Sequence, residues 1–163
     1  MALRTTGSRL PVAIFLALAL AAEAERAWAE GSYPYVTVSA AEAFRQVESG
    51  NLLLIDVRTP DEWTATGVAH KALRLSIEHA FDDDDFVQQV RAAVDGDRSR
   101  PVAVICTSGP RSLRAWNLLI AHAFTRVMHV AEGMNGGDSG RGWIAAELPV
   151  EGCALCKTAV PVQ

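Results

Sequence analysis

The sequence predicts an α/β fold with a mostly parallel central sheet flanked by helices on both faces. Short apolar runs rich in Val, Ile and Leu recur along the chain, and such runs are typical of strands buried on both faces of a sheet. Segments that carry helix start and stop signals separate these runs. Because strands that alternate with helices pair in parallel, this order favours a parallel sheet.

The predicted strands are the apolar, β-branched runs. The run 102–105 is apolar throughout and 52–57 nearly so, as expected for buried strands. The complete set of predicted strands is 36–38, 52–57, 73–77, 102–105 and 127–130, and the first of them is expected at an edge of the sheet.

Helices are predicted from their capping signals. Ser39 and Glu42 form a capping-box pattern, so a helix is expected from there to residue 48, where Gly50 follows as a stop signal. Pro60 opens a second helix, because proline is well suited to the first helical position. Further helices are predicted at 86–94 and 111–124, with a single helical turn at 143–147. The Gly-rich segment 132–142 is predicted to be a long mobile loop.

The charge pattern and the candidate metal motifs argue against a nucleic-acid partner and a metal ion. The net charge is −4 and no Lys/Arg cluster stands out, so we predict no nucleic-acid partner. The acidic run 82–85 lacks the alternation of a calcium loop, and its carboxylates suit the amino terminus of a helix. A single CxxC is weak as a zinc site. We therefore predict no metal ion.

The amino-terminal residues have the pattern of a secretory signal peptide. Arg4 and Arg9 precede the apolar run 10–22, and Ala27-Trp28-Ala29 offers small residues at a cleavage site. We predict a signal peptide at 1–29 cut after Ala29, with cleavage after Ala24 as the weaker alternative. An uncleaved membrane anchor is a competing hypothesis, but the run is shorter than the roughly 20 residues that span a bilayer. The expected location is periplasmic or secreted, with no stable membrane contact after cleavage.

The cysteines fall into two groups. Cys153 and Cys156 form a CxxC near the carboxyl end, whereas Cys106 is isolated. In an oxidising compartment the close pair is expected to form a disulfide, which leaves Cys106 as the free thiol. A redox dithiol and half of a metal site remain competing hypotheses for the CxxC.

Cys106 is predicted to be the nucleophile. It follows a predicted buried strand, and the loop after it opens onto a helix amino terminus. Backbone N–H groups, the helix dipole and the positive charge of Arg111 all favour a thiolate there. Asp56 and Arg58 follow another strand, and the carboxyl ends of parallel strands share one edge of a sheet.

Several motifs together resemble the single-domain rhodanese (thiosulfate sulfurtransferase-like) family. The resemblance covers Tyr35 to Val150, and it gives a domain at 30–150 with a tail at 151–163. The sequence departs from the family pattern at two places. At 67–72 the usual "GHIPGA" reads GVAHKA, and at 132–143 an insertion lengthens the usual compact "GG…W" segment. The motifs are Ile55–Trp63 (IDVRTPDEW), Gly67, Ala72, Cys106–Ser112 (CTSGPRS), Gly142-Trp143 and Leu148-Pro149-Val150.

The resemblance implies a sulfurtransferase without a cofactor. The Cys106 thiolate would take sulfur from thiosulfate or a persulfide and pass it to a thiol or protein cysteine. The family pattern implies that Asp56 and Arg58 support the loop and that Arg111 pairs with the donor. The donor-binding loop would comprise Thr107, Ser108, Gly109, Pro110, Arg111 and Ser112.

Loop length separates a sulfurtransferase from the nearest different enzyme, a phosphatase. Four residues lie between Cys106 and Arg111, whereas the related phosphatases use one residue more. Two functions of a different class stay open as hypotheses. One is a non-catalytic module that binds a partner, and the second is a thiol–disulfide redox protein that uses Cys153 and Cys156.

Overall fold

The computed structural model describes residues 36–78, 80 and 82–153, which belong to one compact unit that begins at Tyr35. The predicted signal peptide 1–29 and Cys156 lie outside the described residues. Within these described ranges, no helix is both long and apolar enough to cross a bilayer.

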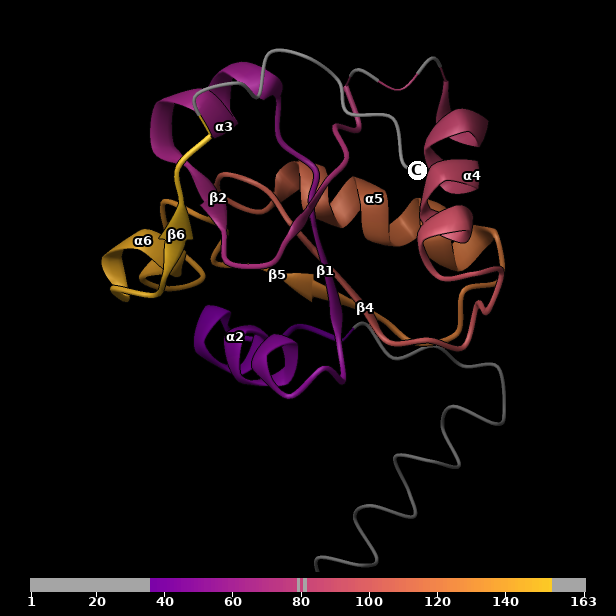
Figure 1. Ribbon diagram of the computed structural model, residues 1–163, viewed down its shortest axis with the longest axis horizontal. Coiled ribbons are helices and arrows are strands. Elements are labelled where there is room, and N and C mark those ends of the chain that lie inside the picture. Colours follow the sequence, from indigo (N-terminus) through magenta and orange to yellow (C-terminus); the bar gives the residue numbers. More distant parts are fainter. Residues whose placement is uncertain (1–35, 79, 81, 154–163) are drawn as a thin grey trace, which may run out of the picture. The chain divides into compact units, whose positions relative to one another are not determined.

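A four-stranded parallel sheet forms the centre of the domain, in the order β3-β1-β4-β5 (Figure 1). Its register places Ile55 of β1 opposite Val104 of β4 on one side and Leu73 of β3 on the other. The parallel sheet confirms the predicted fold class. The strands are β1 (Leu53–Asp56), β3 (Leu73–Arg74), β4 (Val102–Ile105) and β5 (Val127–Val130).

The predicted edge strand at 36–38 appears as a short extension beside β5. Thr37 forms a parallel bridge with His129. The N–H of Val38 donates to the carbonyl of His129 (3.0 Å), and the N–H of His129 donates to the carbonyl of Val36 (2.9 Å). The chain therefore enters the domain at the β5 edge of the sheet.

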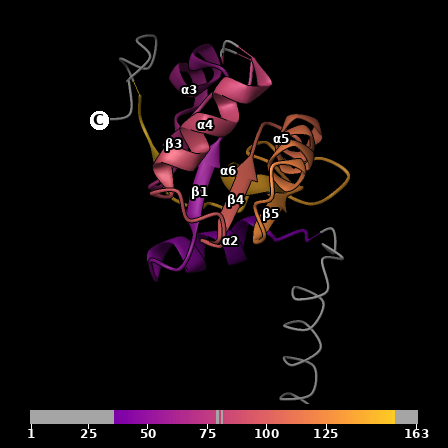
Figure 2. The same ribbon diagram turned by 90° about the vertical axis from the view of Figure 1, so that its right-hand side faces the viewer.

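Helices cover both faces of the sheet (Figures 1 and 2). Alternate strand residues point to opposite sides, so Ile55 and Val104 join one apolar cluster while Leu54 and Ala103 join another. The first cluster takes in buried residues of α4 and α5, and the second takes in buried residues of α2 and α6. The helices are α2 (Ala40–Glu48), α3 (Pro60–Thr66), α4 (Asp83–Ala93), α5 (Pro110–Ala121) and α6 (Gly142–Ala145).

The capping signals act at the positions expected from the sequence. The Ser39 hydroxyl accepts a hydrogen bond from the N–H of Glu42 at the start of α2. The Asp82 carboxylate accepts one from the N–H of Asp85 (2.8 Å), so the acidic run opens α4. Among the described residues, no group of three or more His, Cys, Asp or Glu is arranged to hold a metal ion.

A second, two-stranded ribbon was not predicted. The short strands β2 (Val68–Ala69) and β6 (Val150–Glu151) pair antiparallel. Gly67 precedes β2 with φ +75°, and a Cβ there would lie only 2.7 Å from the carbonyl oxygen of Glu151. The close approach of the two segments therefore requires glycine. Strands of two residues carry no periodic signal that a sequence pattern reveals.

Candidate active site

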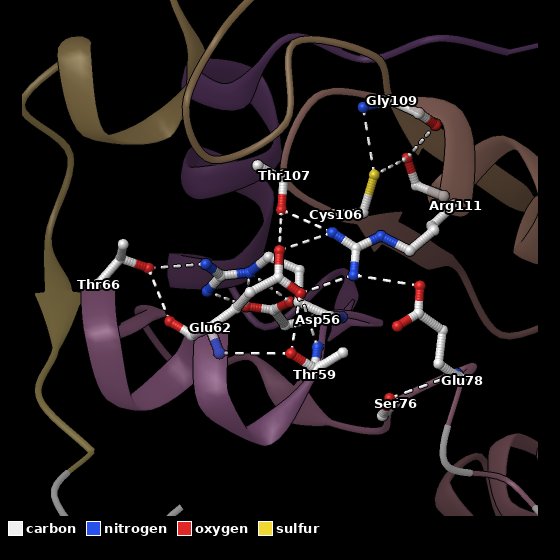
Figure 3. A network of polar contacts seen from close by, with 12 residues as sticks. Asp56, Thr59, Glu62, Thr66, Ser76, Glu78, Cys106, Thr107, Gly109 and Arg111 are labelled. Carbon is white, nitrogen blue, oxygen red and sulfur yellow. Dashed lines mark hydrogen bonds and ion pairs between the residues drawn. The ribbon is translucent and has the colours of Figure 1, made fainter.

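Cys106 lies at the carboxyl end of β4, inside the loop that leads to α5 (Figure 3). The residue is only 1% exposed and is a free cysteine. Its Sγ accepts the backbone N–H of Gly109 at 3.1 Å and lies 3.4 Å from the hydroxyl of Ser112. Two polar groups of the loop therefore lie against the sulfur, and the role of Cys106 as a thiolate nucleophile stays a prediction.

The turn after Cys106 depends on Gly109. This residue has φ +113° and caps α5, which begins one residue earlier than predicted, at Pro110. A Cβ at Gly109 would lie 3.0 Å from the carbonyl oxygen of Ala131. Glycine therefore serves both the backbone conformation and the close packing of the turn.

Ser112 joins the turn to the sulfur. Its hydroxyl donates to the carbonyl of Gly109 (2.8 Å), and the side chain is fully buried. A hydroxyl has one hydrogen to donate. When Cys106 is a thiol, the thiol can donate to Ser112. When Cys106 is a thiolate, the Ser112 hydrogen can turn toward the sulfur.

Arg111, the cation of the loop, is held by protein oxygens (Figure 3). Its two Nη atoms lie 2.6 Å from the two carboxylate oxygens of Glu62, a bidentate arrangement. One Nη also donates to the hydroxyl of Thr107 at 2.7 Å, and the other lies 3.5 Å from Glu78. The hydrogen bonds from Arg111 hold the pKa of Glu62 well below its usual range, and the same contact raises the pKa of Arg111.

Glu62 also caps the helix that carries it. Its Oε2 accepts the N–H of Thr59 at 3.0 Å, while the Thr59 hydroxyl accepts the N–H of Glu62. Sequence reasoning placed a helix start at Pro60 and missed the contact of Glu62 with Arg111. The two residues are 49 positions apart, and nothing in their local patterns links them.

Asp56 and Arg58 form a buried ion pair beside this helix. Arg58 is 1% exposed, and its Nε and Nη2 donate to the carboxylate of Asp56 at 2.7–3.1 Å. The remaining donors reach the Thr66 hydroxyl and the Gly67 carbonyl, both at 2.7 Å. The pair thus ties the end of β1 to the end of α3, the helix that presents Glu62. The printed contacts of the pair reach α3 and Gly67, and its predicted support of the Cys106 loop stays a prediction.

The Gly-rich segment 132–142 packs against the Cys106 loop. The N–H groups of Met134 and Asn135 donate to the carbonyls of Cys106 (2.8 Å) and Thr107 (2.9 Å). Gly133 has φ +66°, and a Cβ there would overlap the Thr107 carbonyl oxygen. The sequence predicted a long mobile loop here, but the structure places this segment as a wall of the site. Backbone hydrogen bonds of this kind leave no side-chain pattern to detect.

Cys153 lies apart from the loop, next to Trp63 and Val68. It is disulfide-bonded, and Nη1 of Arg74 lies 2.8 Å from its sulfur. The pairing with Cys156 stays a prediction, because Cys156 lies outside the described residues. The predicted loop residues Thr107 and Ser108 lie between β4 and α5, and Pro110 is the first residue of α5.

Comparisons with known proteins agree with this architecture. The model of the rhodanese-like domain family matches residues 39–139. The uncharacterized protein RP600 of Rickettsia prowazekii is 27% identical over 107 residues, which cover 62% of this chain and 84% of that protein. The solution structure of the rhodanese-like domain of Alr3790 from Anabaena sp. is 22% identical, with a TM-score of 0.55 over 78% of this chain and 86% of that one.

A further solved structure covers more of the chain. A protein of unknown function from Rhodopseudomonas palustris, RPA3614, is described as a possible tyrosine phosphatase. It is 19% identical, with a TM-score of 0.53 over 92% of this chain and 100% of that one. At this identity the likeness concerns the fold alone. The family model, in contrast, matches more than half of the chain, including β1 and the Cys106 loop. The chain belongs to the rhodanese-like domain family.

Proposed function

We propose that the protein is a sulfurtransferase that carries a sulfane sulfur on Cys106. The observation that carries the proposal is the buried Sγ of Cys106, which accepts the N–H of Gly109 within a six-residue loop that begins at Cys106 and ends at Arg111. Backbone N–H groups and a nearby hydroxyl stabilise negative charge on sulfur. They serve a thiolate and a terminal persulfide alike.

The chemistry proceeds in two displacement steps. The Cys106 thiolate attacks the outer sulfur of a donor, for example thiosulfate. A new S–S bond forms, the old one breaks, and sulfite leaves with the electron pair. A thiophilic acceptor then attacks the outer sulfur of the persulfide. Cyanide would leave as thiocyanate, a thiol as a persulfide, and the Cys106 thiolate is restored in either case.

This chemistry suits the charged groups around the loop. Neither step needs a proton donor for an alcohol leaving group, which phosphate ester hydrolysis requires. Glu62 is a poor donor because its bond to Arg111 lowers its pKa and keeps it ionised. The Nη atoms of Arg111, which a phosphate would need, already contact protein oxygens. These observations favour sulfur transfer over a phosphatase.

Intact-mass spectrometry before and after incubation with a sulfur donor tests the proposal. The protein should gain the mass of one sulfur atom and lose it on addition of cyanide. Cys106→Ser should show no gain. Cys153→Ser/Cys156→Ser is the matched control, because it removes the predicted disulfide pair away from the loop without leaving a new free thiol, and it should react like the parent. An adduct that persists in Cys106→Ser would overturn the proposal.

The same spectra distinguish a sulfurtransferase from a binding module or a redox protein. Absence of any adduct with thiosulfate, thiosulfonate and persulfide donors would favour a module that binds a partner. Dithiol reductase activity that is lost in Cys153→Ser but kept in Cys106→Ser would favour a redox protein.

We also propose that residues 1–29 are removed after export, because their sequence has the pattern of a secretory signal peptide. The amino-terminal sequence of exported protein tests this.

A further inference from the structure

The cation of the catalytic loop is already neutralised by the protein. Arginine carries four hydrogens on its two Nη atoms. In Arg111 these face both carboxylate oxygens of Glu62, the hydroxyl of Thr107 and the carboxylate of Glu78. An anionic donor that pairs with these atoms must first displace Glu62 from a bidentate contact at 2.6 Å.

The cluster also carries an excess of negative charge. Two carboxylates, Glu62 and Glu78, face the single guanidinium of Arg111. The Glu78 side chain is 44% exposed, and Figure 3 shows it on the opposite side of Arg111 from Thr107. A Cys106 thiolate adds a further negative charge within range of Arg111. A donor that reaches Arg111 therefore meets a net negative charge, and a dianion is repelled twice as strongly as a monoanion.

We propose that Glu62 and Glu78 make this site select sulfur donors of low negative charge, such as organic persulfides, over the thiosulfate dianion. The inference rests on the proposed sulfurtransferase function and names its donor class. Glu78 is the specificity-determining residue. Within the described part of the chain its carboxylate, unlike that of Glu62, accepts no backbone N–H, so its charge can be removed without loss of a helix cap.

The transfer from such donors balances without any further reactant. With an organic persulfide, the Cys106 thiolate attacks the outer sulfur of R–S–SH, the S–S bond of the donor breaks, and R–S⁻ leaves. The outer sulfur and its proton stay on Cys106. With a thiosulfonate, R–SO₂–S⁻, the outer sulfur is transferred in the same way and the sulfinate R–SO₂⁻ leaves.

Two donors that differ by one charge test the proposal. Methanethiosulfonate is a monoanion, whereas thiosulfate is a dianion with the same type of transferable sulfur. The measurement is kcat/KM with each donor, at low salt and at 0.1 M salt, for the parent protein and for Glu78→Gln. Asp95→Asn is the charge-matched control. The Asp95 side chain is 94% exposed. Its turn precedes the amino end of β4, whereas Cys106 follows the carboxyl end of the same strand.

The expected result is a charge-dependent gain. Glu78→Gln should raise kcat/KM for thiosulfate about threefold at 0.1 M salt and about eightfold at very low ionic strength. The gain for methanethiosulfonate should be about the square root of these factors, because its charge is half as large. The parent should prefer methanethiosulfonate, and Asp95→Asn should match the parent with both donors.

Each of the following outcomes would refute one part of the proposal. The donor selection would be refuted if the parent protein had a higher kcat/KM with thiosulfate than with methanethiosulfonate. It would also be refuted if Glu78→Gln raised kcat/KM equally for both donors. In either case, formation of the Cys106 persulfide would still support the sulfurtransferase. An equal gain in Asp95→Asn would show an effect of net charge rather than of Glu78. Failure to form a Cys106 persulfide with either donor and with an alkyl persulfide would refute the proposed function itself.

Discussion

Replacement of Asp56 by Asn should strongly destabilise the domain. The Asp56 carboxylate accepts hydrogen bonds from the backbone N–H, Nε and Nη2 of Arg58, and both residues are almost fully buried. Asn has no charge and offers only one oxygen, so the guanidinium stays buried without its counterion. Breaking one partner of a buried pair costs about 3–5 kcal/mol. Since the amide still accepts one bond, we expect a loss near the lower end, about 3 kcal/mol.

Urea unfolding measures this loss. A domain with about 5–15 kcal/mol of total stability would unfold at a clearly lower urea concentration. Asp83→Asn is the control, because Asp83 pairs with Arg114 at the surface, and it should cost less than about 1 kcal/mol. The double variant Asp56→Leu/Arg58→Met should recover much of the loss, since apolar replacement of a buried pair is often neutral. A loss below about 1 kcal/mol in Asp56→Asn would refute the argument.

Three further predictions follow from the loop. Gly133→Ala should abolish persulfide formation, because its Cβ would overlap the Thr107 carbonyl, whereas Gly137→Ala, with open space around it, should retain it in the mass assay. Ser112→Ala should slow persulfide formation about tenfold in stopped-flow kinetics, through loss of about one hydrogen bond to the sulfur. Because Arg111 lowers the pKa of Glu62, the unfolded chain binds more protons, so stability should fall as pH drops below about 4.3. This acid dependence should be shallower in Glu62→Gln, and an equal slope in urea titrations would contradict the prediction.

The parts of the site that are local in sequence could be predicted. The apolar run 102–105 and the Gly109-Pro110 turn specify a strand, a loop and a helix start within a few residues, and Cys106 lies between them. Pro60 likewise starts α3 as expected. These signals work because each one depends on neighbours along the chain.

The contacts that connect distant segments could not be predicted in this way. The ion pair of Glu62 and Arg111 forms only after β1 and β4 align and bring α3 beside the loop. The wall at 132–142 binds the Cys106 loop through backbone N–H groups, which every residue except proline possesses. The sequence therefore predicts the nucleophile, while the charge around it depends on the tertiary fold.

The pairing of β2 with β6 has a consequence for where the chain can be shortened. Val150 and Glu151 contact Gly67, whose carbonyl is one of the acceptors for the buried Arg58. A chain that stopped at Pro149 would leave β2 as an unpaired edge and uncover the apolar side of Trp63. Val150 and Glu151, at the junction with the predicted tail, thus hold β2 beside the buried ion pair of Arg58, and a domain boundary placed after residue 150 would divide β6.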